Sequence, residues 1–271
     1  MRYQIVFCDI DGTLLDSKHH ISKNTGQKIR ELVGSGVPFI LVSARMPGAI
    51  RPIQRELGLE QPMICYSGSL ILGEREDCIH SIGIGREKAV RVDAFIREGW
   101  PQICCSAYSH HDWIAHDLQD EWIVQEQQIT SAAAVKGPIT DVIPPDGQVH
   151  KFLCMGEPGP IESLGKLLKE EFPELTVYRS KDTYLEIMDG SASKSGAIRH
   201  LCRDYGIPVD ASVSFGDSFN DIDMLLATGV SFAMGNAPDE VKKQARFVTL
   251  DNDHEGVLKG LEQLEFAKNR A

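Results

Sequence analysis

The sequence predicts an α/β protein with a doubly wound, Rossmann-like core and an inserted α+β domain. At both ends of the chain, apolar runs of strand length alternate with segments of helical periodicity, which is typical of a parallel sheet covered by helices. In the middle the order of strands and helices becomes mixed. Glycines flank both crossings into this stretch, namely Gly83, Gly85, Gly190 and Gly196. We therefore expect a core of residues 1–82 and 188–271 with an insertion at 83–187.

The first half of the expected core is a strand–helix–strand–helix–strand unit. Residues 4–8 form an apolar run that stops abruptly at Asp9, as a buried parallel strand does. The next elements are expected to be a helix over 25–33, a strand over 37–42, a helix over 49–57 and a strand over 62–66.

The same alternation returns near the end of the chain. It predicts a helix over 195–205, a strand over 211–215, a helix over 221–227 and a strand over 230–233. In the insertion, the expected helices are 87–98, 120–128 and 161–171, and the expected strands are 102–108, 112–117, 151–155, 175–179 and 184–188. Ligands of doubly wound sheets bind beyond the carboxyl ends of the strands, so residues at those ends are the first candidates for function.

Composition narrows the class of protein. The 271 residues carry a formal net charge of -11, which is unfavourable for binding the negatively charged backbone of a nucleic acid. The apolar runs are of strand length, and we expect no membrane span. Seven cysteines at irregular spacing suggest reduced thiols, and no apolar leader is visible at the start, so we expect a cytoplasmic protein.

Two carboxylates follow the first strand, at Asp9 and Asp11, and Gly12 permits a tight loop just beyond. Like charges this close disfavour joint ionisation unless a cation or a shared proton offsets them. A side-chain carboxylate and a backbone carbonyl here can bind one hard cation. Taken alone, the segment is also compatible with a strand end followed by a turn-forming Asp-Gly pair, which is the less favoured interpretation.

Three further features lie where strands end or helices begin. Residues 216–221, Gly-Asp-Ser-Phe-Asn-Asp, offer acidic and amide groups in one loop, although Asp and Asn are also ordinary helix caps. Ser43 follows the second strand, where its hydroxyl can donate to a phosphoryl oxygen or simply cap a turn. Lys194 lies at a helix start, where its charge suits an incoming anion. Alone, each has a plainer explanation; together they form the set of groups that phosphoryl transfer needs.

These motifs resemble those of a known family. Asp9–Thr13 matches the pattern DxDGT, Gly216–Asp221 matches GDxxND, and Met234–Ala237 follows. With Lys194 at the position of the motif lysine, the chain resembles the haloacid dehalogenase-like phosphatases over essentially its whole length. Within them it resembles the Cof-type branch, in which an α/β cap is inserted after the third core strand. The resemblance implies that the core is catalytic and that the insertion selects the substrate.

Two positions depart from the pattern of that branch. Ser43-Ala44-Arg45 stands where Thr-Gly-Arg is usual, so the hydroxyl is kept and the glycine is not. Ser67-Gly68 stands where Asn-Gly is usual. We expect the first change to be mild and the second to bear on the cap–core hinge or the substrate entrance.

The resemblance implies chemical roles. Asp9 would attack phosphorus and become an aspartyl phosphate. Asp11 would protonate the leaving alcohol and then activate the hydrolytic water. Mg²⁺ would be held by Asp9, by the backbone carbonyl of Asp11 and by Asp217, with Asp221 supporting the site through metal-bound water.

The phosphoryl oxygens would be held by Ser43 and Lys194, and Asn220 would orient phosphate or a metal-bound water. The resemblance further implies small phosphorylated metabolites as substrates, sugar phosphates above all, and a monomer or homodimer. Three alternatives stay open from sequence: a phosphomutase on the same core, a receiver-like phosphoaspartate switch, and a non-catalytic binding protein. A receiver would be much shorter and has no use for an insertion of this size.

Overall fold

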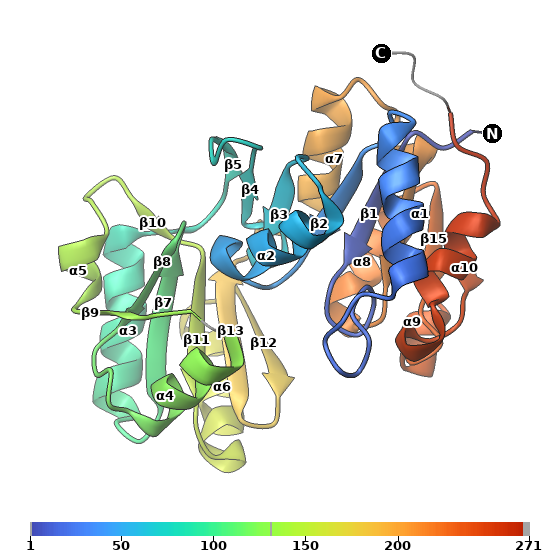
Figure 1. Cartoon of the computed structure of the whole chain (residues 1–271). Helices are drawn as coiled ribbons and strands as arrows, with labels where there is room; N and C mark the ends of the chain where they lie inside the picture. The colour runs from blue at the N-terminus through green and yellow to red at the C-terminus, as the bar shows by residue number, and fades with distance from the viewer. Residues whose placement is uncertain (1, 131, 268–271) are drawn as a thin grey trace. The chain divides into compact units, whose positions relative to one another are not determined.

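The computed structural model describes residues 2–130 and 132–267. The chain forms two compact units (Figure 1). The first comprises Met1–Arg45, Ile50–His80 and Ser193–Ala271, and the second comprises Met46–Ala49 and Ser81–Ala192. The main segment of the second unit is Ser81–Ala192, where the sequence analysis expects the insertion at 83–187.

The first unit is built on an eight-stranded sheet in the order β16-β15-β14-β1-β2-β3-β4-β5. Its strands are β1 (Ile5–Asp9), β2 (Phe39–Val42), β3 (Met63–Cys65), β4 (Leu70–Leu72), β5 (Cys78–Ser81), β14 (Ser212–Gly216), β15 (Val230–Ala233) and β16 (Phe247–Val248). The six strands from β16 to β3 pair in parallel, and β4 pairs antiparallel with β3. From β1 the chain proceeds to β2 on one side, while β14 lies on the other, so the strand order reverses between β1 and β14.

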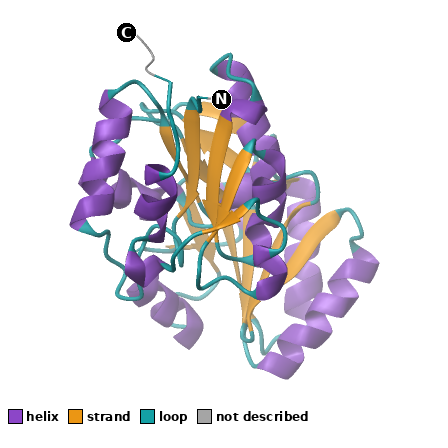
Figure 2. Cartoon of the chain, turned by 90° about the vertical axis from the view of Figure 1, so that its right-hand side faces the viewer, coloured by secondary structure: helices purple, strands orange, loops and turns teal. Residues whose placement is uncertain are grey.

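Helices cover both faces of this sheet (Figure 2). They are α1 (Lys23–Gly34), α2 (Pro47–Leu57), α7 (Lys194–Asp204), α8 (Ile222–Ala227), α9 (Asp239–Lys242) and α10 (Gly256–Glu262). On one face, Ile5 and Phe7 of β1 pack with Ile198 of α7 and Met224 of α8. On the other, α10 lies so close that a Cβ added at Gly260 would be 2.4 Å from the Phe215 ring.

Local capping sets where two of these helices begin. The side chain of Ser22 accepts a hydrogen bond from the Thr25 N–H at the start of α1. Ser193 does the same for the Gly196 N–H at the start of α7. Such caps satisfy backbone donors that have no partner inside the helix. The cap at Ser193 makes Lys194 the first residue of α7.

The second unit has a six-stranded sheet in the order β12-β13-β11-β7-β8-β9. The strands are β7 (Cys104–Ser109), β8 (Asp112–Ala115), β9 (Val135–Lys136), β11 (Lys151–Met155), β12 (Leu175–Lys181) and β13 (Tyr184–Asp189). A two-stranded sheet pairs β6 (Ile84–Gly85) with β10 (Gln148–Val149). The helices are α3 (Arg86–Gly99), α4 (Glu121–Thr130), α5 (Ile139–Val142) and α6 (Pro158–Glu171). Side chains of α3 and α6, among them Val92 and Leu164, form one apolar core with Phe152 and Ile187 of the sheet.

The predicted fold class is confirmed: the core is a doubly wound α/β sheet, and the middle of the chain is α+β. The elements that the sequence did not predict are mostly short, such as β16 and α9, or belong to the hairpin of β4 and β5. In the described part of the chain, every helix is too short or too polar to cross a membrane.

Candidate active site

The candidate site lies at the carboxyl edge of the core sheet, where the strand order reverses. Asp9 is the last residue of β1, Ser43 directly follows β2, and Asp217 directly follows β14. Because β1 pairs with both β2 and β14 in parallel, these ends lie side by side. Doubly wound sheets bind their ligands at this kind of position.

Lys194 links two of the predicted residues. Its ammonium group donates to Asp9 Oδ1 at 2.6 Å and to Asp221 Oδ1 at 2.5 Å. Lys194 is only 1% exposed and Asp221 0%. A buried ammonium needs such charged partners, because burial without them is strongly unfavourable. The helix start at α7 therefore places a fixed cation beside Asp9.

Asp221 organises the loop after β14. Its Oδ2 atom accepts hydrogen bonds from the backbone N–H groups of Asp217, at 3.0 Å, and Ser218, at 2.9 Å. Gly216 is required here, because an added Cβ would lie 2.6 Å from the Cβ of Asp221. Both oxygens of Asp221 therefore already have donors within the protein, one from Lys194 and one from the loop.

Asp217 is held by groups from two other loops. Its Oδ1 atom accepts a hydrogen bond of 2.6 Å from Thr13 Oγ1. The amide of Asn236 donates to the Gly12 carbonyl at 2.9 Å and lies 3.5 Å from Asp217 Oδ2. Gly12 has a φ of +76°, and a Cβ there would lie 2.4 Å from Asp217 Oδ2. The loop after β1 can therefore approach Asp217 only because residue 12 is glycine.

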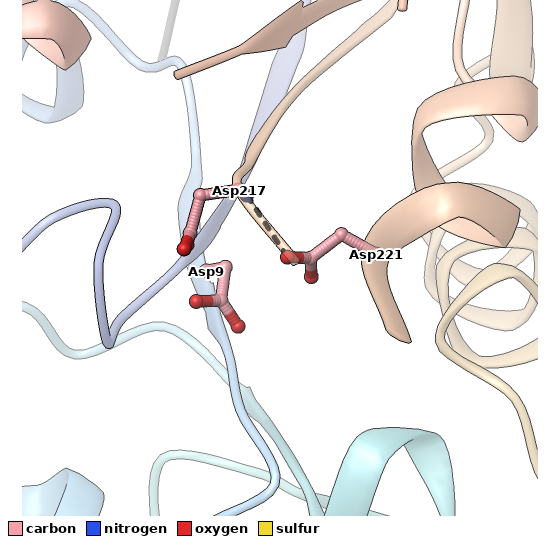
Figure 3. Close-up of side chains that lie close together, drawn as sticks. All are labelled: Asp9, Asp217 and Asp221. Atoms are coloured by element: carbon pink, nitrogen blue, oxygen red, sulfur yellow. Dashed lines mark hydrogen bonds between the residues drawn. The ribbon is translucent and has the colours of Figure 1, made fainter. Parts of the chain in front are cut away.

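The carboxylates of Asp9, Asp217 and Asp221 form an acidic cluster (Figure 3). One ligand atom from each lies within 4.8 Å of the others. Three carboxylates against the one ammonium of Lys194 leave two negative charges when all are ionised. Carboxylate oxygens are the ligands that hard divalent cations prefer. The chemistry and charge of this donor set fit a metal ion such as Mg²⁺.

The pKa values of the cluster reflect this crowding. Burial and the nearby charge of Asp221 raise the pKa of Asp9, and the Lys194 ammonium opposes them. Burial raises the pKa of Asp217 to about 6, against the hydrogen bond from Thr13. Burial alone would lower the pKa of Lys194, but the charges of Asp221 and Asp9 outweigh it and raise that pKa. Without a further cation, the two aspartates therefore hold protons more tightly than usual.

The Asp11 side chain lies outside this cluster and is bound by Arg45. The guanidinium donates from Nε to Asp11 Oδ2 at 2.8 Å and from its second nitrogen to Oδ1 at 2.5 Å. The Asp11 side chain is 48% exposed and that of Arg45 29% exposed. Among the described residues, the three-carboxylate group does not include the Asp11 side chain.

The two remaining predicted residues, Ser43 and Asn220, differ in burial and in hydrogen bonding. Ser43 is buried; its N–H donates to the Ile64 carbonyl at 2.9 Å, and its Oγ accepts from the Arg45 N–H at 3.1 Å. Asn220 is half-buried in the short turn Phe219–Asp221. In the part of the chain that the structure describes, the Asn220 side chain makes no hydrogen bond to the cluster carboxylates.

Three residues of the site received no role from the sequence. Thr13 lies within the first motif, and its hydroxyl bonds Asp217. Arg45 closes the second motif, two residues after Ser43. Asn236 follows β15, so its position after a core strand was the available signal. Each contacts another site residue from a loop at the same sheet edge.

Comparisons with known proteins show which family the chain belongs to. A family model described as haloacid dehalogenase-like hydrolase matches residues 6–261. A Haemophilus influenzae protein that carries a provisional phosphatase name is 36% identical over 263 residues, which cover 97% of this chain and 98% of that protein. This chain therefore belongs to the haloacid dehalogenase-like hydrolase family, as its motifs predict.

Solved structures share the fold. A Thermotoga maritima protein has a TM-score of 0.87 and 26% identity, covering 98% of this chain and 99% of that one. A sugar phosphatase of the same superfamily has a TM-score of 0.81 and 22% identity, covering 96% of this chain and 98% of that one. At the latter identity the likeness shows the fold alone.

Proposed function

We propose that this protein is a magnesium-dependent phosphatase that hydrolyses small phosphorylated metabolites through an aspartyl-phosphate intermediate on Asp9. The observation that carries the proposal is the buried contact of 2.6 Å between Asp9 and Lys194 at the switch point of the sheet. This contact supports the proposal because a carboxylate beside a fixed cation is suited to attack on an anionic group.

In the first step, a carboxylate oxygen of Asp9 attacks phosphorus and the bond from phosphorus to the leaving oxygen breaks. Asp11 gives its proton to that oxygen, which leaves as an alcohol. Lys194 and Ser43 bind the phosphoryl oxygens, with Asn220 beside them. Their part is to neutralise and orient the phosphoryl group while the bond order changes.

In the second step, Asp11 takes a proton from a water molecule, and that water attacks phosphorus. The bond from phosphorus to Asp9 breaks, inorganic phosphate leaves, and both aspartates return to their starting state. Asp11 exchanges a proton first with the leaving group and then with water, and its side chain, 48% exposed, is open to solvent.

We assign the metal to Asp9, Asp217 and the backbone carbonyl of Asp11, with Asp221 in a supporting role. Asp221 is given the supporting role because both of its carboxylate oxygens already accept hydrogen bonds from protein groups. Bound Mg²⁺ would supply positive charge to the phosphoryl oxygens and to Asp9.

For the substrate we propose sugar phosphates or related metabolites, with the second unit selecting the leaving group. The name of one structural neighbour, a sugar phosphatase, points in this direction. We expect the enzyme to act in the cytoplasm, a reducing compartment that suits its seven free cysteines. We further expect a monomer or homodimer.

The test is release of inorganic phosphate from a panel of phosphorylated sugars and other small metabolites, with Mg²⁺ and with chelator. Asp9→Asn removes the nucleophile with little change of shape. Asp210→Asn is the matched control, because Asp210 is an exposed aspartate of the same unit.

Release that needs Mg²⁺, is lost in Asp9→Asn and survives in Asp210→Asn is the expected result. A stable phosphoryl-protein without release would contradict hydrolysis and favour a switch. Transfer of the phosphoryl group to a second sugar would instead identify a mutase.

A further inference from the structure

The turn after β3 joins two parts of the candidate site. It comprises residues Tyr66–Gly68 and lies at the same sheet edge as Ser43. The Ser67 N–H donates to the Ser43 carbonyl at 2.9 Å. On its other side, Gly68 lies so close to α7 that an added Cβ would be 2.1 Å from the Ser193 carbonyl oxygen and 2.9 Å from the Lys194 nitrogen. Ser67 is thus fixed between the residues assigned to the phosphoryl oxygens.

The backbone of this turn is unusual. Tyr66 has a φ of 49°, and Ser67 has a φ of 51° with a ψ of 33°. Left-handed conformations are unfavourable for residues other than glycine, and two in succession are rare. They persist only where surrounding contacts fix them, and they are common at functional sites. Here the fixing contacts come from Ser43 and Ser193.

Independently of the backbone, the hydroxyl group of Ser67 is buried without a hydrogen-bond partner among the described residues. Ser67 is 5% exposed, and its Oγ atom has no hydrogen-bond partner among the described residues. Other buried serines of the core sheet do have partners: Ser212 donates to the Val209 carbonyl, and Ser214 pairs with Thr228. A buried hydroxyl without a partner is unfavourable, so it calls for a group that the protein itself does not provide.

We propose that the Ser67 hydroxyl donates a hydrogen bond to the substrate's phosphoryl group, as a third donor beside Ser43 and Lys194. This inference rests on the proposed function. Burial does not argue against it, because Ser43 and Lys194 are as buried, at 2% and 1% exposed. The ligand is a phosphate oxyanion, whose several oxygens each accept more than one hydrogen bond. The Ser67 hydroxyl would then gain a hydrogen-bond partner when the phosphoryl group binds.

The test compares Ser67→Ala with the wild-type protein, using inorganic phosphate in the presence of Mg²⁺ as the probe. We expect the Kd for phosphate to rise about tenfold or more, as for loss of a hydrogen bond to a charged group. The Kd for Mg²⁺ should stay unchanged, and the midpoint of unfolding should not fall, because the Ser67 hydroxyl makes no hydrogen bond to any described residue. Ser67→Asn restores a donor in a residue that tolerates a positive φ, and it should recover most of the phosphate affinity.

Ser212→Ala is the matched control, because Ser212 is also buried and its hydroxyl donates to a backbone carbonyl. It should lower the midpoint of unfolding and leave phosphate affinity unchanged. If Ser67→Ala binds phosphate within twofold of wild type, the Ser67 assignment is wrong while the phosphatase proposal stands. If the wild-type protein itself neither binds phosphate nor releases it from any substrate, both fail together.

Discussion

The guanidinium of Arg45 binds the carboxylate of Asp11 through two hydrogen bonds, of 2.8 and 2.5 Å. Paired in this way, Asp11 is held at the sheet edge beside the cluster of Asp9, Asp217 and Asp221 without joining it. Planar, two-point pairing fixes both the position and the rotation of a carboxylate. Arg45 is therefore a positioning residue for the proposed general acid.

Replacement of Arg45 by lysine keeps the positive charge but cannot reproduce the two-point hydrogen bonding to the Asp11 carboxylate. We expect kcat to fall about tenfold or more for an alkyl phosphate, since general acid–base catalysis contributes about 100- to 10,000-fold and depends on orientation. For p-nitrophenyl phosphate, whose leaving group needs little protonation, the fall should be smaller. Steady-state kinetics on both substrates measures the difference.

Asp11→Asn is the reference for that comparison and should show the same bias toward the alkyl substrate. Arg55→Lys, on the outer part of α2, is the control and should change neither rate. Equal losses on both substrates in Arg45→Lys would mean that Arg45 serves phosphate binding and not Asp11.

Gly12→Ala tests the close approach of the first loop to Asp217. The added methyl would lie 2.4 Å from Asp217 Oδ2, and the φ of +76° is unfavourable for alanine. We expect the Mg²⁺ concentration for half-maximal activity to rise about tenfold or more, because either the loop or Asp217 must move. Gly34→Ala is the control, since a Cβ at the end of α1 meets nothing within 4 Å. An unchanged Mg²⁺ requirement in Gly12→Ala would show that Asp217 does not hold the metal.

Much of this site could be predicted from the sequence, because parallel strands align their carboxyl ends. Once 4–8 and 211–215 are recognised as strands, Asp9 and Asp217 must lie near one edge. The ion pair of Lys194 with Asp221 was not predictable, since it depends on how α7 packs against the loop after β14. Nor was the Arg45 pairing with Asp11, because a side chain of that length can reach several groups. The sequence marked Ser67-Gly68 only as a departure from the usual Asn-Gly pair, and gave no sign of the left-handed turn there.

Binding of Mg²⁺ should depend on pH through Asp217. Its pKa of about 6 in the folded protein lies above the ordinary value of 3.8. For the metal-free protein, this group's unfavourable effect on stability is absent below the lower pKa and complete above the higher one. Protons compete with metal for the carboxylate, so the Kd for Mg²⁺ should be about tenfold higher at pH 5 than at pH 7. Calorimetric titration at both values measures it.

Thr13→Val sharpens this test, because it removes the hydrogen bond that lowers the Asp217 pKa. The loss of Mg²⁺ affinity on acidification should then begin at a higher pH than in wild type. A Kd for Mg²⁺ that is equal at pH 5 and pH 7 would contradict the placement of Asp217 in the metal site.

Lys194→Met removes the buried ammonium and keeps a side chain of similar length. Asp9 and Asp221 are then left without a protein cation in a buried setting. Breaking a buried ion pair from one side typically costs about 3–5 kcal/mol of unfolding free energy. We expect a loss of this order in chelator at neutral pH, measured by denaturant unfolding. Toward pH 5 the loss should shrink, because burial and Asp221 raise the pKa of Asp9 and a proton then replaces the missing cation.

Added Mg²⁺ should recover part of the stability of Lys194→Met, since a metal ion bound to the folded protein stabilises it. Activity should not return, because the phosphoryl oxygens still lack their fixed donor. Lys259→Met is the control: it removes a surface ion pair with Glu262 and should leave stability almost unchanged. If both variants unfold at the denaturant concentration of the wild type, the carboxylates beside Lys194 are not both ionised in the folded protein, and the charge balance inferred for the metal site is wrong.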